Sequence, residues 1–500
     1  MSKRIFGIET EFGCMIEANQ LNISSEGVAS VVRDHVFHEL QLGISDIHYR
    51  DYGEPPGNGG FLFNGGRLYI DMGHLEYATP ECVDLLSLVA YDKAIERLIT
   101  HITDELGLNE SVSFFKNNID HFTGATFGCH ENYQLRRDIP FYKVVIPALM
   151  PFFVTRQIYA GAGRVGGYEE ILDFEDVQPS GDAFHGYQIS QRADHIVTEI
   201  YEWIQFSRAI INTRDEPLSD YTKYRRLHLL VGDTNMSEFA NALKVGTTSL
   251  VLDLIERGHQ PGNIALADPV GALKDISRDQ TFQWIVQLES GDTMSAIDLQ
   301  RKYLELAQKF LKGQDADTDW VLTNWESVLD DLEEDWESVR DRVDWAAKKW
   351  LLETFMEEEG LSWADSWLES LDLEYHHIDP ERSLFCELEN QGQMIKLVTP
   401  ENIDAAIRNA PEATRAKARA AVMRYLSKNN MPCIVDWHQI YFTHEEPFEM
   451  EDPFQTYEEE VERLLKRLSR QPRIHPQREK QERSQRQKPR IARVQRVRAE

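Results

Sequence analysis

The sequence of 500 residues contains no run of about 18 or more uninterrupted apolar residues, the length that a membrane-spanning helix needs. Its first residues carry only Lys3 and Arg4 ahead of Ile5 and Phe6, without the apolar core of a signal peptide. The five cysteines are widely spaced and form no C-x-x-C pair. We therefore expect no membrane segment, thiols that act as small buried hydrophobes, and a cytoplasmic location.

Positive charge is scarce over most of the chain, since Lys and Arg number 53 against 84 Asp and Glu, a formal net charge of −31. The final segment 471–500 is the exception: it is rich in Arg, Gln and Pro and nearly free of large apolar residues. This composition predicts a disordered basic tail that binds RNA, an acidic protein or the acidic body of the chain, or only aids solubility. The body lacks the positive surface that neutralises duplex phosphates, so we do not expect it to bind nucleic acid.

Two short segments place polar or charged side chains at every second position: Glu9 and Glu11 in the first, and Arg67, Tyr69 and Asp71 in the second. Apolar residues lie between or beside them. In a β-strand this alternation sends the polar set to one face and the apolar set into the core. Carboxylates on one face repel one another unless a cation or a substrate amine offsets their charge.

The oxygen-bearing side chains of these strands, together with Glu76, suit Mg²⁺ better than Zn²⁺, which favours His and Cys. Mg²⁺ usually keeps several waters and bridges substrate phosphates, so a few carboxylates and ATP complete its shell. Arg67 offers a planar fork of donors that fits a phosphate. The pattern predicts a magnesium-nucleotide site, whereas a single E-x-E pair on its own is more typical of a solvated strand face.

Two further polar clusters, 130–132 and 212–216, adjoin strand-like segments and either contact a substrate or cap turns. The glycine-rich segment 161–167 has neither the Lys-Ser/Thr ending of a P-loop nor the strand-to-helix setting of a dinucleotide fingerprint. We interpret it as a hinge for the polar loop or flap that follows, Tyr168 to Phe184.

The periodicity of apolar residues predicts an α+β chain, with a sheet from its amino-terminal half and helices that cover the sheet. A loop rich in Gly and Pro, 52–60, interrupts the first strands. Five tryptophans between 320 and 350 are predicted to anchor helix packing rather than to bind a ligand. The expected elements are helices at 80–106, 142–156, 403–427 and 457–468, a mostly helical region at 238–371, and strands at 112–116, 228–231 and 433–437.

A series of segments resembles, in order along the chain, the Pup ligase and depupylase family, which is related to glutamine synthetase. The segments are Gly7–Gly13, Gly66–Asp71, Glu76–Thr79, Phe115–Asn118, Gly128–Asn132, Ile211–Pro217, Tyr224–His228, Leu243–Thr247 and Val435–Trp437. The resemblance covers nearly all of the chain except the tail. It implies a glutamine synthetase-like α+β catalytic domain at 1–410, with a mainly antiparallel sheet covered by helices. A small C-terminal domain at 411–470 and the basic tail at 471–500 complete the expected organisation.

The resemblance implies an ATP-dependent ligase. ATP transfers its γ-phosphoryl group to the side chain of the carboxy-terminal glutamate of a Pup-like modifier, and a lysine of a target protein then attacks the acyl phosphate to form an isopeptide bond. The implied cofactors are ATP and Mg²⁺, and the implied partners are the modifier and lysine-bearing proteins. The roles that the matching motifs imply are Mg²⁺ binding for Glu9, Tyr69 and Glu76, ATP binding for Arg67, Thr79 and Trp437, and proton removal from the lysine for Asp71.

Segments that differ between the two branches of the family point mostly to the ligase side. The ligase-like segments are Glu9–Gly13, Gly128–Asn132, Asn235–Glu238 and Asp452–Phe454. The segment Gln188–Asp194 and the spacing between Asp71 and Glu76, one residue tighter than the usual ligase pattern, lean towards depupylases. The Gly/Pro loop ahead of Arg67 has intermediate length. We expect a ligase, with a depupylase or deamidase, and a catalytically silent modifier-binding homologue, as the alternatives.

Overall fold

The computed structural model describes residues 4–17, 22–50, 53–121, 126–167, 184–202, 208–442 and 446–470. The predicted flap, apart from Phe184, and the predicted basic tail lie outside these residues. The chain divides into two compact units, Met1–Tyr457 and Glu458–Glu500. Helix α13 (Glu458–Ser469) is the described element of the second unit. Among the described helices, none is both long and apolar enough to cross a membrane.

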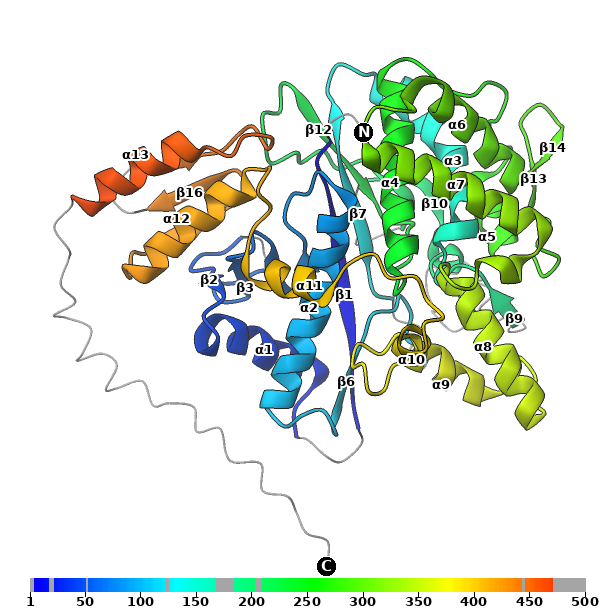
Figure 1. Cartoon of the computed structure of the whole chain (residues 1–500), viewed down its shortest axis with the longest axis horizontal. Coiled ribbons are helices and arrows are strands. Elements are labelled where there is room, and N and C mark those ends of the chain that lie inside the picture. The colour runs from blue at the N-terminus through cyan, green and yellow to red at the C-terminus, as the bar shows by residue number, and fades with distance from the viewer. Residues whose placement is uncertain are drawn as a thin grey trace, which may run out of the picture. The chain divides into compact units, whose positions relative to one another are not determined.

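A ten-stranded sheet organises the first unit, with β1 near its middle (Figure 1). The strand order is β10-β11-β12-β7-β1-β5-β4-β3-β2, and β6 pairs with the second half of β1. Neighbouring strands are antiparallel except β10 and β11, which are parallel. The strands are β1 (Phe6–Ile16), β2 (Gly43–Ser45), β3 (Gly59–Leu62), β4 (Arg67–Asp71), β5 (His74–Ala78), β6 (Val112–Phe115), β7 (Cys129–Arg136), β10 (Thr198–Tyr201), β11 (Ala209–Asn212) and β12 (Tyr224–Leu229).

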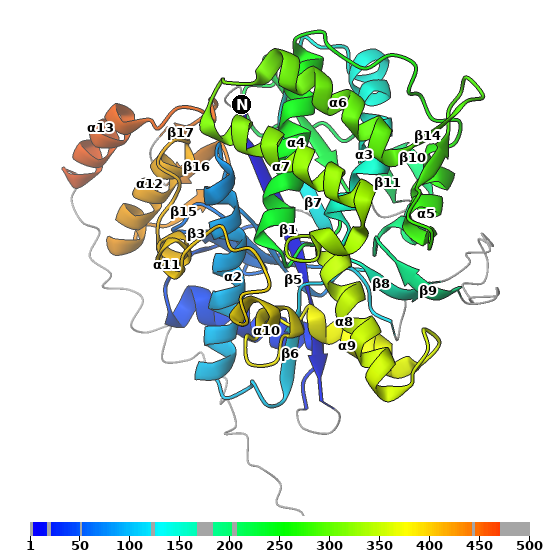
Figure 2. The same ribbon diagram turned by 45° about the vertical axis from the view of Figure 1, so that its right-hand side comes forward.

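Helices pack against one face of this sheet. Helix α1 contacts β4 and β5, α2 contacts β1, and α3 and α4 contact β11 and β7. Helices α3, α4, α6 and α7 pack on one another as one layer (Figure 2). The helices of the first unit are α1 (Ser25–Asp34), α2 (Leu85–Glu105), α3 (Ile146–Ala160), α4 (Glu238–Glu256), α5 (Pro269–Arg278), α6 (Ala296–Leu311), α7 (Ala316–Glu334), α8 (Asp344–Glu359), α9 (Ser366–Tyr375), α10 (Leu384–Asn390), α11 (Pro400–Arg408) and α12 (Ala416–Lys428).

Two two-stranded sheets also belong to the unit: β8 (Arg164–Gly167) pairs with β9 (Phe184–Gln188), and β13 (Ile285–Gln287) pairs with β14 (Thr293–Ser295). The segment that we interpreted as a hinge thus ends in a strand. The carboxy-terminal part carries a three-stranded sheet of β15 (Cys433–Val435), β16 (Gln439–Phe442) and β17 (Phe448–Glu449). The predicted fold class, α+β with a mainly antiparallel sheet covered by helices, is confirmed.

The alternation in the first strands is also confirmed. Ile8, Phe12 and Leu68 are fully or almost fully buried in the core, where they pack with residues of the covering helices. Helix α2 starts later than predicted, because the Asp84 side chain accepts a hydrogen bond from the Ser87 backbone N–H (2.8 Å) and caps it there. The apolar side chains of the sheet therefore face helices and leave a polar face on the other side.

One predicted helix, 403–427, is wrong, since the structure has two helices there, α11 and α12. Pro411 lies between them. Proline has no N–H to donate and disfavours helical backbone in the residue before it. Consistently, the backbone at Asn409 is already extended, with φ −115° and ψ 142°.

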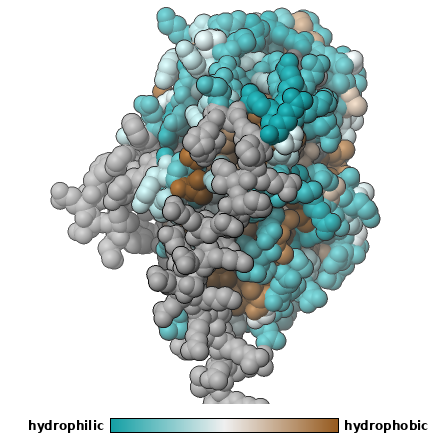
Figure 3. Space-filling view, turned by 90° about the vertical axis from the view of Figure 1, so that its left-hand side faces the viewer, coloured by the Kyte–Doolittle hydropathy of each residue, from teal (hydrophilic) through white to brown (hydrophobic). Residues whose placement is uncertain are grey.

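The tryptophans of the acidic region anchor helix packing, as predicted. Trp325 and Trp345 are fully buried. Trp345 stacks on Phe282 with ring centroids 5.6 Å apart and donates its indole N–H to the Ile158 carbonyl oxygen (2.8 Å). The surface seen in Figure 3 is mostly hydrophilic, with apolar residues in small groups.

A buried ion-pair network joins α12 to the main sheet. Glu81, just beyond β5, accepts hydrogen bonds from Arg415 Nε (2.7 Å) and from Arg419 Nη1 (3.0 Å) and Nη2 (2.5 Å). All three side chains are buried. Burial opposes ionisation of Glu81, but the charges of Arg419 and Arg415 outweigh it and lower the pKa of Glu81 to about 2. The ionised carboxylate is therefore part of the folded state.

We predict that Glu81→Gln costs about 3–5 kcal/mol in the free energy of unfolding at neutral pH, because two buried guanidinium groups lose their anion. The usual pKa of a glutamate is 4.5 and the folded value is lower, so this stabilisation is present above pH 4.5 and is lost as the pH falls towards 2. Denaturant unfolding at several pH values should show the difference between the two proteins shrinking below pH 4.5. The matched control is Glu412→Gln, because Glu412 is exposed and pairs with Lys417 at the surface. Equal losses of unfolding free energy in Glu81→Gln and Glu412→Gln would contradict the prediction.

Candidate active site

The polar face of the sheet carries acids from three adjacent strands. In the pairing of β1 with β5, Glu11 lies opposite Glu76, and in the pairing of β5 with β4, Glu76 lies opposite Tyr69. Asp71 ends β4, opposite His74 at the start of β5. Strand pairing thus brings Glu11 together with Tyr69, Asp71 and Glu76, which lie far from it in the sequence.

Glu11, Asp71 and Glu76 each offer an oxygen, and these oxygens lie within 4.8 Å of one another. The Tyr69 hydroxyl donates to Glu76 Oε1 (2.6 Å). Burial, followed by the charges of Glu11 and Glu9, raises the pKa of Glu76 well above its usual value. Burial, followed by the charge of Glu11, also raises the pKa of Asp71. When they are ionised, these crowded carboxylates repel one another. The oxygen-rich cluster therefore fits a hard divalent cation, which would offset their negative charge.

Glu9 lies on the same face but is turned towards other partners. Its Oε1 accepts hydrogen bonds from Arg226 Nη2 (3.1 Å) and Asn132 Nδ2 (3.2 Å), and its Oε2 lies 3.2 Å from His130 Nδ1. Burial opposes ionisation of Glu9, but the charge of Arg226, the hydrogen bond to His130 and the charge of His228 outweigh it and lower the pKa of Glu9. Glu9 is therefore a carboxylate that stays ionised.

Arg67 is buried and already neutralised. Its guanidinium lies over the Tyr69 ring, 4.2 Å from the centroid, and forms ion pairs with Glu54 and with Asp46 (3.2 Å). Glu54 comes from the Gly/Pro-rich loop that precedes the strand. A phosphate at Arg67 would have to share it with these two acids.

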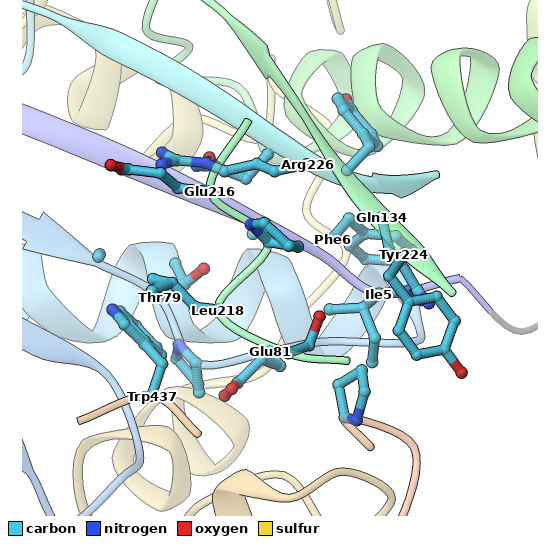
Figure 4. A pocket seen from close by; sticks show the side chains of 18 of the residues that line it. Ile5, Phe6, Thr79, Glu81, Gln134, Glu216, Leu218, Tyr224, Arg226 and Trp437 are labelled. Carbon is cyan, nitrogen blue, oxygen red and sulfur yellow. Dashed lines mark hydrogen bonds between the residues drawn. The ribbon is translucent and has the colours of Figure 1, made fainter. Parts of the chain in front are cut away.

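A cavity of about 160 Å³ opens beside the amino-terminal half of β1. Thr79, Trp437, Glu9 and Arg226 line it, and Figure 4 shows Thr79 and Trp437 on one side of the cavity with Arg226 on the other. The Thr79 hydroxyl accepts a hydrogen bond from the Ile8 backbone N–H (3.0 Å). The cavity combines an aromatic wall with a cationic end, which suits a planar base that carries phosphates.

The structure brings together most of the residues that the sequence singled out. Glu9, Thr79 and Trp437 line the cavity, whereas Tyr69, Asp71 and Glu76 lie in or beside the oxygen-rich cluster. Arg67 does not line the cavity. The roles of all seven residues stay predictions.

Several residues of the site were not assigned a role from sequence. His228 and Arg226 stand at alternate positions of β12, and they reach Glu9 across β7. The alternation of Arg226 and His228 along the strand was the signal in the sequence that could have identified them as residues of the site. Neighbouring residues of the 130–132 cluster face opposite sides of the sheet. His130 contacts Glu9 on the polar face. Glu131 faces the core and pairs with Arg156 (2.6 Å), and the side chains of Glu131 and Arg156 are fully or nearly fully buried.

Comparisons with known proteins extend over almost all of the first unit. The model of the Pup-ligase protein family matches residues 4–441. The Pup deamidase/depupylase of Mycolicibacterium smegmatis is 38% identical over 453 residues, which cover 84% of this chain and 88% of that protein. A crystal structure of the complex between Pup and its ligase PafA matches with a TM-score of 0.79 at 34% identity, and covers 93% of this chain and 91% of that one. A structure of the Pup ligase PafA with ADP matches with a TM-score of 0.73 at 34% identity, over 91% and 96%. This chain therefore belongs to the Pup ligase family.

Proposed function

We propose that this chain is an ATP-dependent ligase that phosphorylates the carboxy-terminal glutamate side chain of a Pup-like modifier and joins it to lysines of target proteins. The observation that carries the proposal is the succession of two features along β1: the cavity beside Thr79 and Trp437, and then the oxygen-rich cluster of Glu11, Asp71 and Glu76. When the base of a nucleotide fills the cavity, the phosphates of that nucleotide extend past Arg226 towards the cluster, where a carboxylate substrate can meet them.

Magnesium fits the donor set of the cluster. Glu76 and Tyr69 would hold it together with Glu11 or Glu9, all through oxygen atoms. When bound, Mg²⁺ supplies positive charge to the phosphates and relieves the repulsion among the carboxylates. The chain's own part is to fix the carboxylates on a rigid sheet, to hold Glu9 ionised through Arg226, and to position the base with Trp437.

Asp71 is suited to remove a proton from the attacking lysine. It lies at the end of β4, half-buried, and therefore within reach of a substrate that arrives from solvent. Its raised pKa makes it a stronger base than an ordinary aspartate. Proton removal leaves a neutral amine, which attacks the acyl phosphate with formation of the isopeptide bond and release of phosphate.

Removal of the modifier is the second candidate function. It is favoured by the 38% identity to a protein named Pup deamidase/depupylase and by the segment Gln188–Asp194. The solved ligase structure covers more of this chain, 93% against 84%, so we place ligation first. Net conjugate formation from purified components separates the two, because a depupylase would only consume a preformed conjugate.

We predict that Asp71→Asn lowers the rate of conjugate formation by about 100-fold or more, because the amide cannot accept the proton. The assay contains the protein, ATP, Mg²⁺, a modifier that ends in glutamate, and a lysine-bearing target, and it follows the covalent adduct by gel shift. Calorimetric binding of ADP should stay close to wild type. Asp404→Asn is the control, since Asp404 is exposed and pairs with Arg97 on the protein surface. An unchanged rate in Asp71→Asn would remove Asp71 from this role.

We also predict that Gly128→Ala lowers conjugation about ten- to hundred-fold, because misplacing reacting groups by a fraction of an ångström is costly. A Cβ at this position would lie 2.5 Å from Glu11 Oε1 and 2.7 Å from His130 Nε2, so both side chains must move. Gly262→Ala is the matched control, because its Cβ would meet nothing within 4 Å. Wild-type rates in both variants would show that the placement of Glu11 and His130 does not limit the reaction.

A further inference from the structure

Arg192 is a buried arginine without a counter-ion. It is only 2% exposed and directly precedes the single 3₁₀ turn Ala193–His195. Within the described part of the chain, its guanidinium forms no ion pair and makes one hydrogen bond, from Nη1 to the Phe127 carbonyl oxygen (2.8 Å), while the buried Nε has no partner. The other buried arginines in the described ranges all pair with carboxylates: Arg4, Arg67, Arg156, Arg164, Arg415 and Arg419.

The charges around Arg192 do not replace the missing partner. Asp194, two residues further along the chain, is already paired with Arg278 (2.8 Å). Burial, followed by the like charge of Arg208, lowers the pKa of Arg192 to about 10, and the charge of Glu11 offsets this only in part. A buried charge without a counter-ion is costly, so it commonly marks the place of an anionic ligand.

Buried hydrogen bonds fix the backbone that carries Arg192. Its N–H donates to Asp233 Oδ1 (3.0 Å), which also accepts from the Ser190 hydroxyl (3.0 Å). Asp233 Oδ2 accepts from the N–H groups of Gln191 (2.9 Å) and Ala162 (2.8 Å). The side chain therefore starts from a rigid segment, which lowers the entropy that is lost when an anion binds to it.

The guanidinium lies beyond the oxygen-rich cluster, on the far side from the cavity. Its partner Phe127 precedes Gly128, whose carbonyl oxygen accepts a hydrogen bond from the Glu11 N–H (3.1 Å). A Cβ on Gly13 would lie 3.3 Å from the Phe127 ring, so Phe127 lies beside β1 past Glu11. Neither Phe127 nor Arg192 lines the cavity, which adjoins the earlier residues of β1. The order along β1 is therefore cavity, cluster and Arg192.

This order matches what a carboxylate substrate needs. The nucleotide phosphates reach the cluster from the cavity, so the carboxylate that they meet comes from the opposite side, where Arg192 lies. A carboxy-terminal glutamate carries two carboxylates, and only the one on its side chain receives the phosphoryl group. The other one would be repelled by the acids of the cluster unless a cation neutralises it. A guanidinium is well suited to this task, since its planar fork matches a carboxylate.

We propose that Arg192 binds the main-chain carboxylate of the modifier's carboxy-terminal residue while the side chain of that residue faces the oxygen-rich cluster. The inference rests on the proposed function for the identity of this residue. It makes the free carboxy terminus a recognition element, because a glutamate inside a chain has no main-chain carboxylate. Arg192 thereby selects the terminal glutamate over all internal ones.

The test uses fluorescently labelled Pup made to end in glutamate, with either a free α-carboxylate or an α-carboxamide, and measures its binding to the full-length protein by anisotropy. We expect the wild type to bind the free form at least ten-fold more tightly, and Arg192→Gln to bind both forms equally. Arg192→Lys should keep part of the preference, since it keeps the charge. Arg463→Gln is the matched control, because Arg463 is exposed and pairs with Glu460.

Thermal unfolding of the unliganded proteins separates binding from a structural role. Arg192→Gln should unfold at a temperature no lower than the wild type, because it removes a buried charge without a counter-ion. Equal affinity of the wild type for the two forms of Pup would overturn the proposal, and so would a preference that Arg192→Gln retains. A preference that Arg192→Gln abolishes, in a protein that forms no conjugate with ATP and Mg²⁺, would count against the ligase proposal and leave this one standing.

Discussion

The arrangement of the site depends on electrostatic repulsion among carboxylates that the sheet holds in one place. Antiparallel pairing of β1, β5 and β4 puts Glu11 opposite Glu76 and brings Asp71 beside them. In an unfolded chain these charges would move apart, but the backbone hydrogen bonds of the sheet and the packed core hold them together. Burial, followed by the charges of Glu11 and Glu9, raises the pKa of Glu76 well above its usual value. A cation beside a phosphate chain is the natural way to relieve it, and it is what phosphoryl transfer requires.

Ion pairs and packing on the helix-covered side of the sheet stabilise the fold against the repulsion among the carboxylates on the polar face. On the helix-covered side, Arg156 neutralises Glu131, and Lys116 pairs with Asp92 and Glu96. Buried pairs of this kind add little net stability over apolar packing, but breaking one is expensive. They fasten β7 to α3 and the end of β6 to α2. The polar face can then be built for binding and chemistry, since the opposite face and the core carry the fold.

The parts of this molecule that the sequence predicts are those governed by local periodicity. Alternation at Glu9 to Phe12 and at Arg67 to Asp71 gives both the strands and the face of each side chain. The break at Pro411 was open to prediction from the chemistry of proline, but the apolar pattern on either side concealed it. The start of α2 at Leu85 depends on one capping hydrogen bond, which the Ser87 backbone N–H donates to Asp84 and which the periodicity of apolar residues does not reveal.

Pairing between distant segments is what the sequence does not reveal. The sequence alone does not show that Glu54 and Asp46 form ion pairs with Arg67, or that His228 approaches Glu9 across β7. These contacts depend on strand order, which tertiary packing decides. The family resemblance supplied the predicted roles of Glu9, Asp71 and Trp437, but the sequence analysis did not identify the histidine pair beside Glu9.

The most direct test of the central claim is calorimetric titration of the full-length protein with ADP, once with Mg²⁺ and once with EDTA. If the carboxylates converge on a cation beside the nucleotide cavity, affinity for ADP should be measurable with Mg²⁺ and at least ten-fold weaker without it, because the phosphates would then face uncompensated negative charge. Equal affinity under the two conditions would contradict the account.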